Sequence, residues 1–293
     1  MKRSCRIAAG LTLLSYLAVG PGTALAQSDE RVIYASVVDN NGAAVKNLTP
    51  KDFIVREDGV VREVLRIERD NDPMKIALLV DNSAAMQDSR MSDLRRGVSA
   101  FVTGMRDGVQ IAIITLADRP TILVDYTTDR ERLRKSAEGI AAFSGTGNYV
   151  LDGISETSQA LSKERAERPV IVVISSDGVE LSYRRYDLVL DRLQESDAAL
   201  HIVVVKVPEG GQSVDRDLVF SRGSNDTGGR YDDLLISTAL EWKMKQVADE
   251  LSNQYRVIFA RPQKLVPPKR TEVEVRNPQL RARGKLLRTE KER

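Results

Sequence analysis

The sequence predicts a doubly wound α/β domain, with a mainly parallel sheet and helices on both faces, plus a small β-rich domain from the flanking segments. Four continuous apolar runs rich in β-branched residues indicate strands buried on both faces. These runs are residues 76–80, 111–114, 170–174 and 202–205. Helical patterns separate the runs, and strand-like patterns precede and follow them, which is the basis for the predicted fold.

The helices are predicted from apolar residues that recur every three or four positions. Their stripes include, in chain order, Leu94, Leu133, Ile154, Leu193 and Val247. Thr128 followed by Glu131 predicts a capping box at the start of the second helix. Residues 121–124 follow the second apolar run too closely for a helical crossover, so we expect an antiparallel strand at the sheet edge.

Strand-like segments lie on both sides of the α/β pattern. On the N-terminal side, Asp58 and Gly59 separate two β-rich runs and predict a tight hairpin, because both residues tolerate positive φ. On the C-terminal side, residues 255–260 and 271–275 have strand patterns. The economical interpretation is that the two segments pair with each other and the α/β domain is an insertion. Alternatively, both segments extend the main sheet.

The first residues have the pattern of an export signal. Lys2, Arg3 and Arg6 precede an apolar run at residues 7–19, which is too short to span a bilayer. Ala24 and Ala26, on either side of Leu25, then form the small-x-small motif that signal peptidase cleaves. We therefore expect cleavage after Ala26 and a periplasmic or secreted protein. The alternative is an uncleaved N-terminal anchor. The predicted organisation is a signal peptide at 1–26, a β-rich segment at 27–72, the α/β domain at 73–253, a β segment at 254–286 that pairs with the N-terminal one, and a charged tail at 287–293.

Composition excludes several classes of protein. The chain of 293 residues has 44 Lys and Arg against 42 Asp and Glu, which argues against nucleic-acid or polybasic membrane binding. One Cys and one His exclude a disulfide framework within the chain and His-rich metal sites. The near-neutral total hides an asymmetry, because residues 261–293 carry 11 basic and 4 acidic residues and leave an acidic body. Such a body suits a cation site.

Polar residues follow the buried strands at the ends where ligands bind to open parallel sheets. The first strand is followed by Asp81 and Ser83, and the third strand by Asp177. Thr146 lies in the Gly-rich loop before the third helix. Oxygen ligands of this kind suit a hard cation such as Mg²⁺. Alternatively, Asp81 and Asp177 cap helices or accept bonds from loop amides.

These residues resemble the metal-ion-dependent adhesion site of von Willebrand factor A domains, and the whole mature chain resembles the bacterial VWFA-related family. Residues 53–59, 228–230 and 251–255 resemble that family's flanking elements. The family site has an Asp-x-Ser-x-Ser run, a Thr and a second Asp. Carried over, these positions are Asp81, Ser83, Thr146 and Asp177, while Ala85 replaces the second Ser.

The resemblance implies a site for Mg²⁺, or Mn²⁺ or Ca²⁺, at which an acidic side chain of a partner protein completes the coordination. A methyl group at Ala85 cannot bind a cation, so the site is partly degenerate and we expect weak binding. The predicted function is an exported protein–protein interaction module, not an enzyme, with an unknown envelope or extracellular partner. One alternative is a metal-independent scaffold of the same fold. A second is a Mg²⁺-dependent hydrolase or phosphoryl-transfer enzyme, although no phosphate-binding loop or nucleophile elbow is present in the sequence.

Three other features have structural interpretations. His201 begins a predicted buried strand and is expected to be a core or edge residue. Trp242 on the last helix is expected to pack against the protein. Residues 209–229 are rich in Gly, Ser and Asp and predict a long surface loop, either a partner contact or a simple connector.

Overall fold

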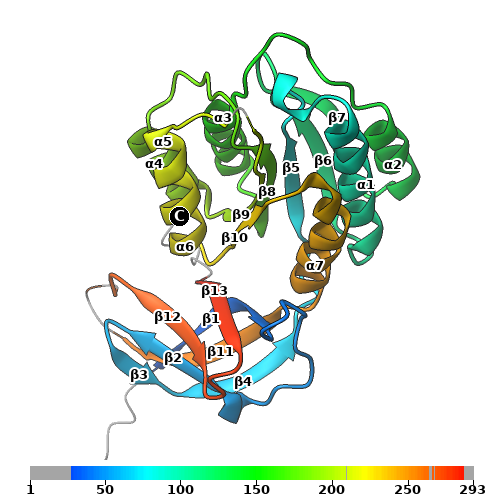
Figure 1. The fold of residues 1–293 in the computed structure, drawn as a ribbon. Coiled ribbons are helices and arrows are strands. Elements are labelled where there is room, and N and C mark those ends of the chain that lie inside the picture. Colours follow the sequence, from blue (N-terminus) through cyan, green and yellow to red (C-terminus); the bar gives the residue numbers. More distant parts are fainter. Residues whose placement is uncertain (1–27, 209, 264–265, 267, 287–293) are drawn as a thin grey trace, which may run out of the picture.

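The computed structural model describes residues 28–208, 210–263, 266 and 268–286. The predicted signal peptide and the charged tail lie outside these residues. Figure 1 shows an α/β layer structure joined to a smaller β-rich part that contains both the first and the last described strands. No helix of the described part is long and apolar enough to cross a membrane.

The α/β part is built on a six-stranded sheet in the order β10-β9-β8-β5-β6-β7. The four predicted strands are β5 (Lys75–Val80), β6 (Gln110–Thr115), β8 (Pro169–Ser176) and β9 (Ala199–Val205), all parallel. β7 (Thr121–Thr127) pairs antiparallel with β6, as expected. A further parallel strand, β10 (Tyr231–Leu234), completes the other edge and was not predicted.

Helices cover both faces of this sheet, which confirms the predicted fold class. One face is covered by α1 (Ser89–Gly104), α2 (Arg130–Glu138) and α7 (Leu240–Ser252). The other is covered by α3 (Val150–Lys163) and α4 (Tyr186–Ser196). Successive residues of β5 alternate between the two cores, which is why its sequence is apolar without interruption.

Three local expectations are wrong. The helix cap of α2 is Asp129, whose carboxylate accepts a bond from Arg132 N at 3.0 Å, so Thr128 forms no capping box. Trp242 is 56% exposed because it lies off the apolar stripe of α7.

The third correction concerns the predicted loop at residues 209–229. It contains α5 (Val214–Leu218), a π-helical turn (Val219–Gly223) and α6 (Ser224–Asp226) in direct succession. Ser213 caps this segment, and Val219 and Phe220 are buried in the core beneath α3 and α4. Buried polar residues, Arg216, Ser224 and Thr227, add hydrogen bonds that hold this segment.

The flanking segments pair with each other, as the economical interpretation expected. β1 (Ser28–Val38) lies between β11 (Tyr255–Pro262) and β13 (Arg281–Leu286), and β4 (Val64–Arg69) borders β11. A second sheet contains β12 (Thr271–Val275), β2 (Phe53–Glu57) and β3 (Val60–Arg62). The two sheets share one apolar core. Asp58 and Gly59 form the predicted hairpin turn, with φ angles of 48° and 80°.

Two successive glycines before β10 permit close approaches of the backbone, Gly228 to the β-rich part and Gly229 to β9 of the α/β part. Gly228 has a φ of +68°, and a Cβ there would lie 2.1 Å from the carbonyl oxygen of Gly284 in β13. A Cβ on Gly229 would lie 1.9 Å from the carbonyl oxygen of Leu200 in β9. Larger residues at these positions would separate the strands that they bring together.

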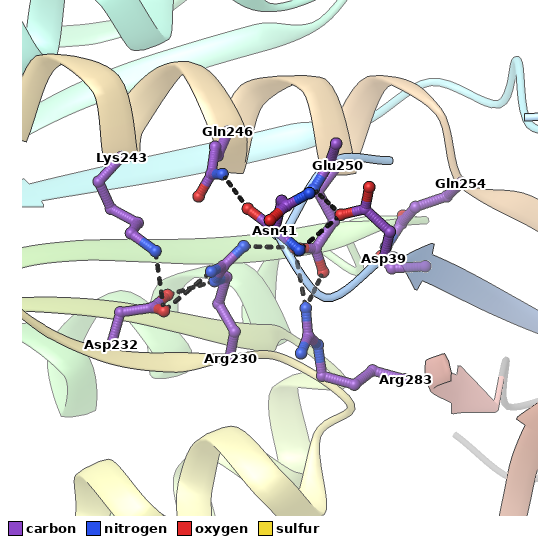
Figure 2. Close-up of polar contacts among 11 residues, drawn as sticks. Asp39, Asn41, Arg230, Asp232, Lys243, Gln246, Glu250, Gln254 and Arg283 are labelled. Atoms are coloured by element: carbon purple, nitrogen blue, oxygen red, sulfur yellow. Dashed lines mark hydrogen bonds and ion pairs between the residues drawn. The ribbon is translucent and has the colours of Figure 1, made fainter. Parts of the chain in front are cut away.

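A buried carboxylate connects the two parts (Figure 2). Glu250 of α7 is 1% exposed and accepts bonds from Arg230 Nη1 at 2.6 Å and from Arg283 Nη2 at 2.8 and 2.9 Å. Arg230 precedes β10 and Arg283 lies in β13, so one side chain of α7 bonds to two other segments. Burial alone would raise the pKa of Glu250, but Arg283 and Arg230 hold that pKa below its usual range.

Polar contacts extend this cluster. Arg230 and Lys243 both bind Asp232, and Gln246 Nε2 donates to the carbonyl oxygen of Asn41, in the turn after β1, at 2.7 Å (Figure 2). His201 is fully buried near these charges, and burial lowers its pKa to about 4, which keeps the ring neutral at pH 7. The expectation that His201 is a core residue is confirmed.

We expect Glu250→Ala to lower the free energy of unfolding by about 3–5 kcal/mol, because it leaves two arginines beside a buried space without their shared partner. Urea unfolding followed by circular dichroism measures the change. Glu241→Ala is the matched control, since Glu241 forms an exposed pair with Lys245 on the same helix and should change the free energy of unfolding far less than Glu250→Ala. Equal effects of the two substitutions would contradict this role for Glu250.

Candidate functional site

The four predicted site residues lie at the carboxyl edge of the six-stranded sheet. Asp81 directly follows β5 and Asp177 directly follows β8, while Thr146 is in the loop between α2 and α3. Ser83 precedes a short 3-10 helix (Ala84–Met86), and the amide of Ala84 donates to the carbonyl oxygen of Thr146 at 3.2 Å. The two loops that carry the hydroxyl groups are therefore in direct contact.

Asp81 is fully buried, and hydrogen bonds surround its carboxylate. Oδ1 accepts from Ser83 N at 2.9 Å. Oδ2 accepts from Asn148 Nδ2 at 3.0 Å, Ser176 N at 2.8 Å and Ser176 Oγ at 2.6 Å. Three of these four bonds go to Oδ2 and one to Oδ1, so Oδ1 alone has an acceptor position left. Asp81 thus organises the loops and has little capacity left for a direct ligand.

Asn148 is a site residue that the sequence interpretation missed. Its Nδ2 donates to Asp81 Oδ2 and, at 2.7 Å, to Ser175 Oγ, so it connects β5, β8 and the loop before α3. The residue is fully buried, and its Oδ1 has no hydrogen-bond partner among the described residues. Its position two residues after Thr146, in a loop that already carried a candidate ligand, is the only sequence signal that could have indicated it.

Asn82 holds the neighbouring loops in place. Its Oδ1 accepts from Ala117 N at 2.9 Å, and its Nδ2 donates to the carbonyl oxygen of Ala141 at 3.0 Å. Its own carbonyl oxygen accepts from Phe143 N at 2.7 Å. One side chain and its backbone therefore fix the end of β6 and the start of the loop that carries Thr146.

Two hydroxyl oxygens are available at this edge. Ser83 Oγ is buried, and no described atom forms a hydrogen bond with it. Thr146 Oγ1 donates to the carbonyl oxygen of Phe143 at 3.0 Å, which leaves its lone pairs free to face a ligand. Ser83 and Thr146 are therefore suited to bind a cation or a hydrogen-bond donor.

Asp177 offers one carboxylate oxygen. Its Oδ1 accepts from Val207 N at 2.8 Å, and its backbone carbonyl oxygen accepts from Gly211 N at 2.7 Å. Its Oδ2 lies 3.7 Å from Lys206 Nζ, in an ion pair. Asp177 is thus fixed in position by loop amides and has a positive charge beside its second oxygen.

A buried arginine positions the loops around Asp177. Arg216 is 3% exposed and donates to the carbonyl oxygens of Gly178, at 2.7 Å, and Gly211, at 2.6 Å. Nearby, burial raises the pKa of Glu180 to about 7 although its Oε1 accepts a bond from Ser182 N. The sequence analysis did not indicate Arg216, because it lies in the segment that was predicted to be a loop.

Ser83, Thr146 and Asp177 could each offer one oxygen to a hard cation. The buried hydroxyl of Ser83 has no hydrogen-bond partner among the described residues. The methyl group at Ala85 removes one further ligand. A Cβ on Gly178 would lie only 2.7 Å from Ala85 Cβ, so Ala85 lies directly against the loop of Asp177. Among the described residues, no group of three or more His, Cys, Asp or Glu side chains could hold a metal ion.

The arrangement of strands and site residues defines an α/β domain with a ligand-binding edge. Residues 76–179 match the family model of the von Willebrand factor type A domain. The chain thus contains a von Willebrand factor type A domain, a type of domain that generally mediates protein–protein interactions. None of the curated proteins compared with the chain is similar enough to count as a match.

Two solved structures with TM-scores above 0.5 agree with this fold, and a third is similar at a lower score. A von Willebrand factor type A structure from Catenulispora acidiphila is similar at 8% identity and a TM-score of 0.51, over 88% of this chain and 65% of that one. Proximal thread matrix protein 1 from the mussel byssus is similar at 15% identity and a TM-score of 0.51, over 67% of this chain and 50% of that one. The conserved hypothetical protein BatB from Bacteroides thetaiotaomicron has 14% identity and a TM-score of 0.48, over 61% of this chain and 100% of that one.

Proposed function

We propose that this protein is a protein–protein interaction module that binds its partner at the carboxyl edge of the six-stranded sheet. The observation that supports this proposal most directly is the convergence of Ser83, Thr146 and Asp177, with a buried hydroxyl of Ser83 that has no partner among the described residues. The domain type is consistent with it, because von Willebrand factor type A domains are generally interaction modules and not enzymes.

Exposed apolar side chains border these oxygens and would enlarge the contact. Phe143 N donates to the carbonyl oxygen of Asn82. The carbonyl oxygen of Val179 accepts from Asn148 N, and Leu181 N donates to the carbonyl oxygen of Asn148. All three are exposed, and Tyr183 in the same loop is 86% exposed. Exposed apolar groups around a polar centre are typical of protein interaction surfaces.

A divalent cation is the finer part of the proposal. Ser83, Thr146 and Asp177 would hold Mg²⁺, or Mn²⁺ or Ca²⁺, while Asp81 keeps their loops in position. When bound, the ion would supply a positive coordination site for a carboxylate of the partner. The alternative is a metal-independent scaffold, which is supported by Ala85 and by the four hydrogen bonds to Asp81.

Crosslinking capture from a bacterial envelope extract tests where the partner binds. We expect Tyr183→Ser to reduce capture of the partner several-fold, because it removes a large exposed side chain beside the site. Trp242→Ser is the matched control, since Trp242 is an exposed aromatic on α7, which covers the face of the sheet opposite to α3, whereas Tyr183 N donates to Asp152 of α3. Loss of capture with EDTA would support the ion, and unchanged capture would support the scaffold. Equal capture by both variants would refute binding at this edge.

Restoring the missing hydroxyl should strengthen metal binding. We expect Ala85→Ser to raise the affinity for Mg²⁺ on the order of tenfold, because it adds one oxygen ligand to a site that has few. Isothermal titration calorimetry of both proteins with MgCl₂ measures the change. If neither protein binds Mg²⁺, the ion has no part in this site. Turnover of phosphate esters that Asp177→Asn abolishes would instead support the enzyme alternative.

We also propose that the protein is exported and that its signal peptide is removed. Expression in a bacterial host should give a mature protein in the periplasm or medium whose first residue is Gln27. N-terminal sequencing of the exported protein measures this directly. A chain that retains Met1 would contradict cleavage.

A further inference from the structure

Lys206 is a charged residue at the site that the sequence analysis did not single out. It directly follows β9, and its backbone amide donates to the carbonyl oxygen of Leu234 at 2.8 Å, which fixes the start of its side chain beside β10. Its Nζ lies 3.7 Å from Asp177 Oδ2 and 3.2 Å from Asp233 Oδ1. The ammonium group therefore lies between two carboxylates at the same edge of the sheet as Ser83 and Thr146.

The position of this ammonium group conflicts with a cation on Asp177. Oδ1 of Asp177 already accepts a bond from Val207 N, so Oδ2 is the oxygen left for an ion. Mg²⁺ bound directly to Oδ2 at about 2.1 Å would lie within about 6 Å of Lys206 Nζ. Two cations at this distance repel each other. The ion and the lysine thus compete for one oxygen.

The remaining ligands do not favour the ion in this competition. Ala85 supplies no oxygen, and Asp81 already accepts four hydrogen bonds from protein donors. Lys206, in contrast, is covalently attached and needs no dehydration of a divalent ion, which is costly for Mg²⁺. Asp233 Oδ1, 3.2 Å from Nζ, is a second carboxylate that holds the ammonium group beside Asp177.

We propose that the ammonium group of Lys206 is the resident cation of this site and takes the place of the divalent ion at Asp177. A divalent ion then binds only when Lys206 moves from Asp177 to Asp233 alone. In the resident state, the positive charge presented to an acidic group of the partner belongs to the protein itself. The inference rests on the proposed location of the binding site, but it concerns the cation and not the identity of the partner.

The test is a titration of the full mature protein with MnCl₂, in which electron paramagnetic resonance reports free Mn²⁺. We expect Lys206→Gln to raise the affinity for Mn²⁺ at least about tenfold over the wild type, because it removes the competing charge. The double variant Lys206→Gln and Ala85→Ser should bind most tightly. Lys206→Arg keeps the positive charge and should bind as weakly as the wild type.

Lys245→Gln is the control for a general change in charge. Lys245 is also an exposed lysine paired with a carboxylate, Glu241, but it lies on α7, so its removal should leave Mn²⁺ affinity unchanged. Thermal unfolding of each variant checks that it folds. Equal affinity of the wild type and Lys206→Gln would overturn the proposal. Absence of binding in every variant, including the double one, would also overturn it, because Lys206 would then not be what excludes the ion.

These outcomes separate the inference from the proposed function. The Mn²⁺ titration uses no partner, so its failure concerns Lys206 alone. Failure of the proposed binding edge appears instead in the capture experiment, as equal capture by Tyr183→Ser and Trp242→Ser. A protein that captures its partner in EDTA and binds Mn²⁺ only after Lys206→Gln would support both statements.

Discussion

The buried carboxylate of Glu250 is the constraint on which the joining of the two parts depends. A charge at 1% exposure persists only when opposite charges reach it, and the two that do so come from different parts of the chain. Arg230 joins the segment before β10 to Glu250, and Arg283 joins β13 of the β-rich part to the same carboxylate. The close approach of Gly228 to Gly284 places β13 beside the segment that carries Arg230. The orientation of α7 between the two parts follows from this arrangement.

At the opposite edge of the sheet, hydrogen bonding decides which carboxylates are available. Asp81 and Asp177 look equivalent in sequence, since each follows a buried strand, but the structure gives them different surroundings. The carboxylate of Asp81 accepts hydrogen bonds from three segments, whereas one oxygen of Asp177 lies beside the ammonium group of Lys206. A motif read from sequence identifies residue types, and the loops around them determine which role each residue has.

The same distinction explains what could be predicted. β5, β6, β8 and β9 were predictable because strands covered on both faces must be continuously apolar. β10 was not, because its Asp232 and Asp233 are held by charges that arrive from elsewhere in the fold. Asp81, Ser83 and Asp177 could be placed from the rule that ligands bind beyond strand ends, and Thr146 from the resemblance to the adhesion site. Asn148 and Lys206 could not, since their roles arise only when separate loops meet. The helical segment before β10 was missed because only a few of its side chains face the core.

The pairing of β1 with β11 and β13 has a consequence for the order of folding. Val32 and Ile258 are partners although 226 positions separate them, so direct closure of this loop from an unfolded chain carries a large entropic cost. Once the α/β domain has folded, however, its two ends are adjacent, and Asp70 N donates to the carbonyl oxygen of Gln254 at 3.0 Å. The inserted domain then acts as a short rigid bridge that brings distant strands together. During synthesis, β1 therefore cannot pair with β11 and β13 until nearly the whole chain has been made.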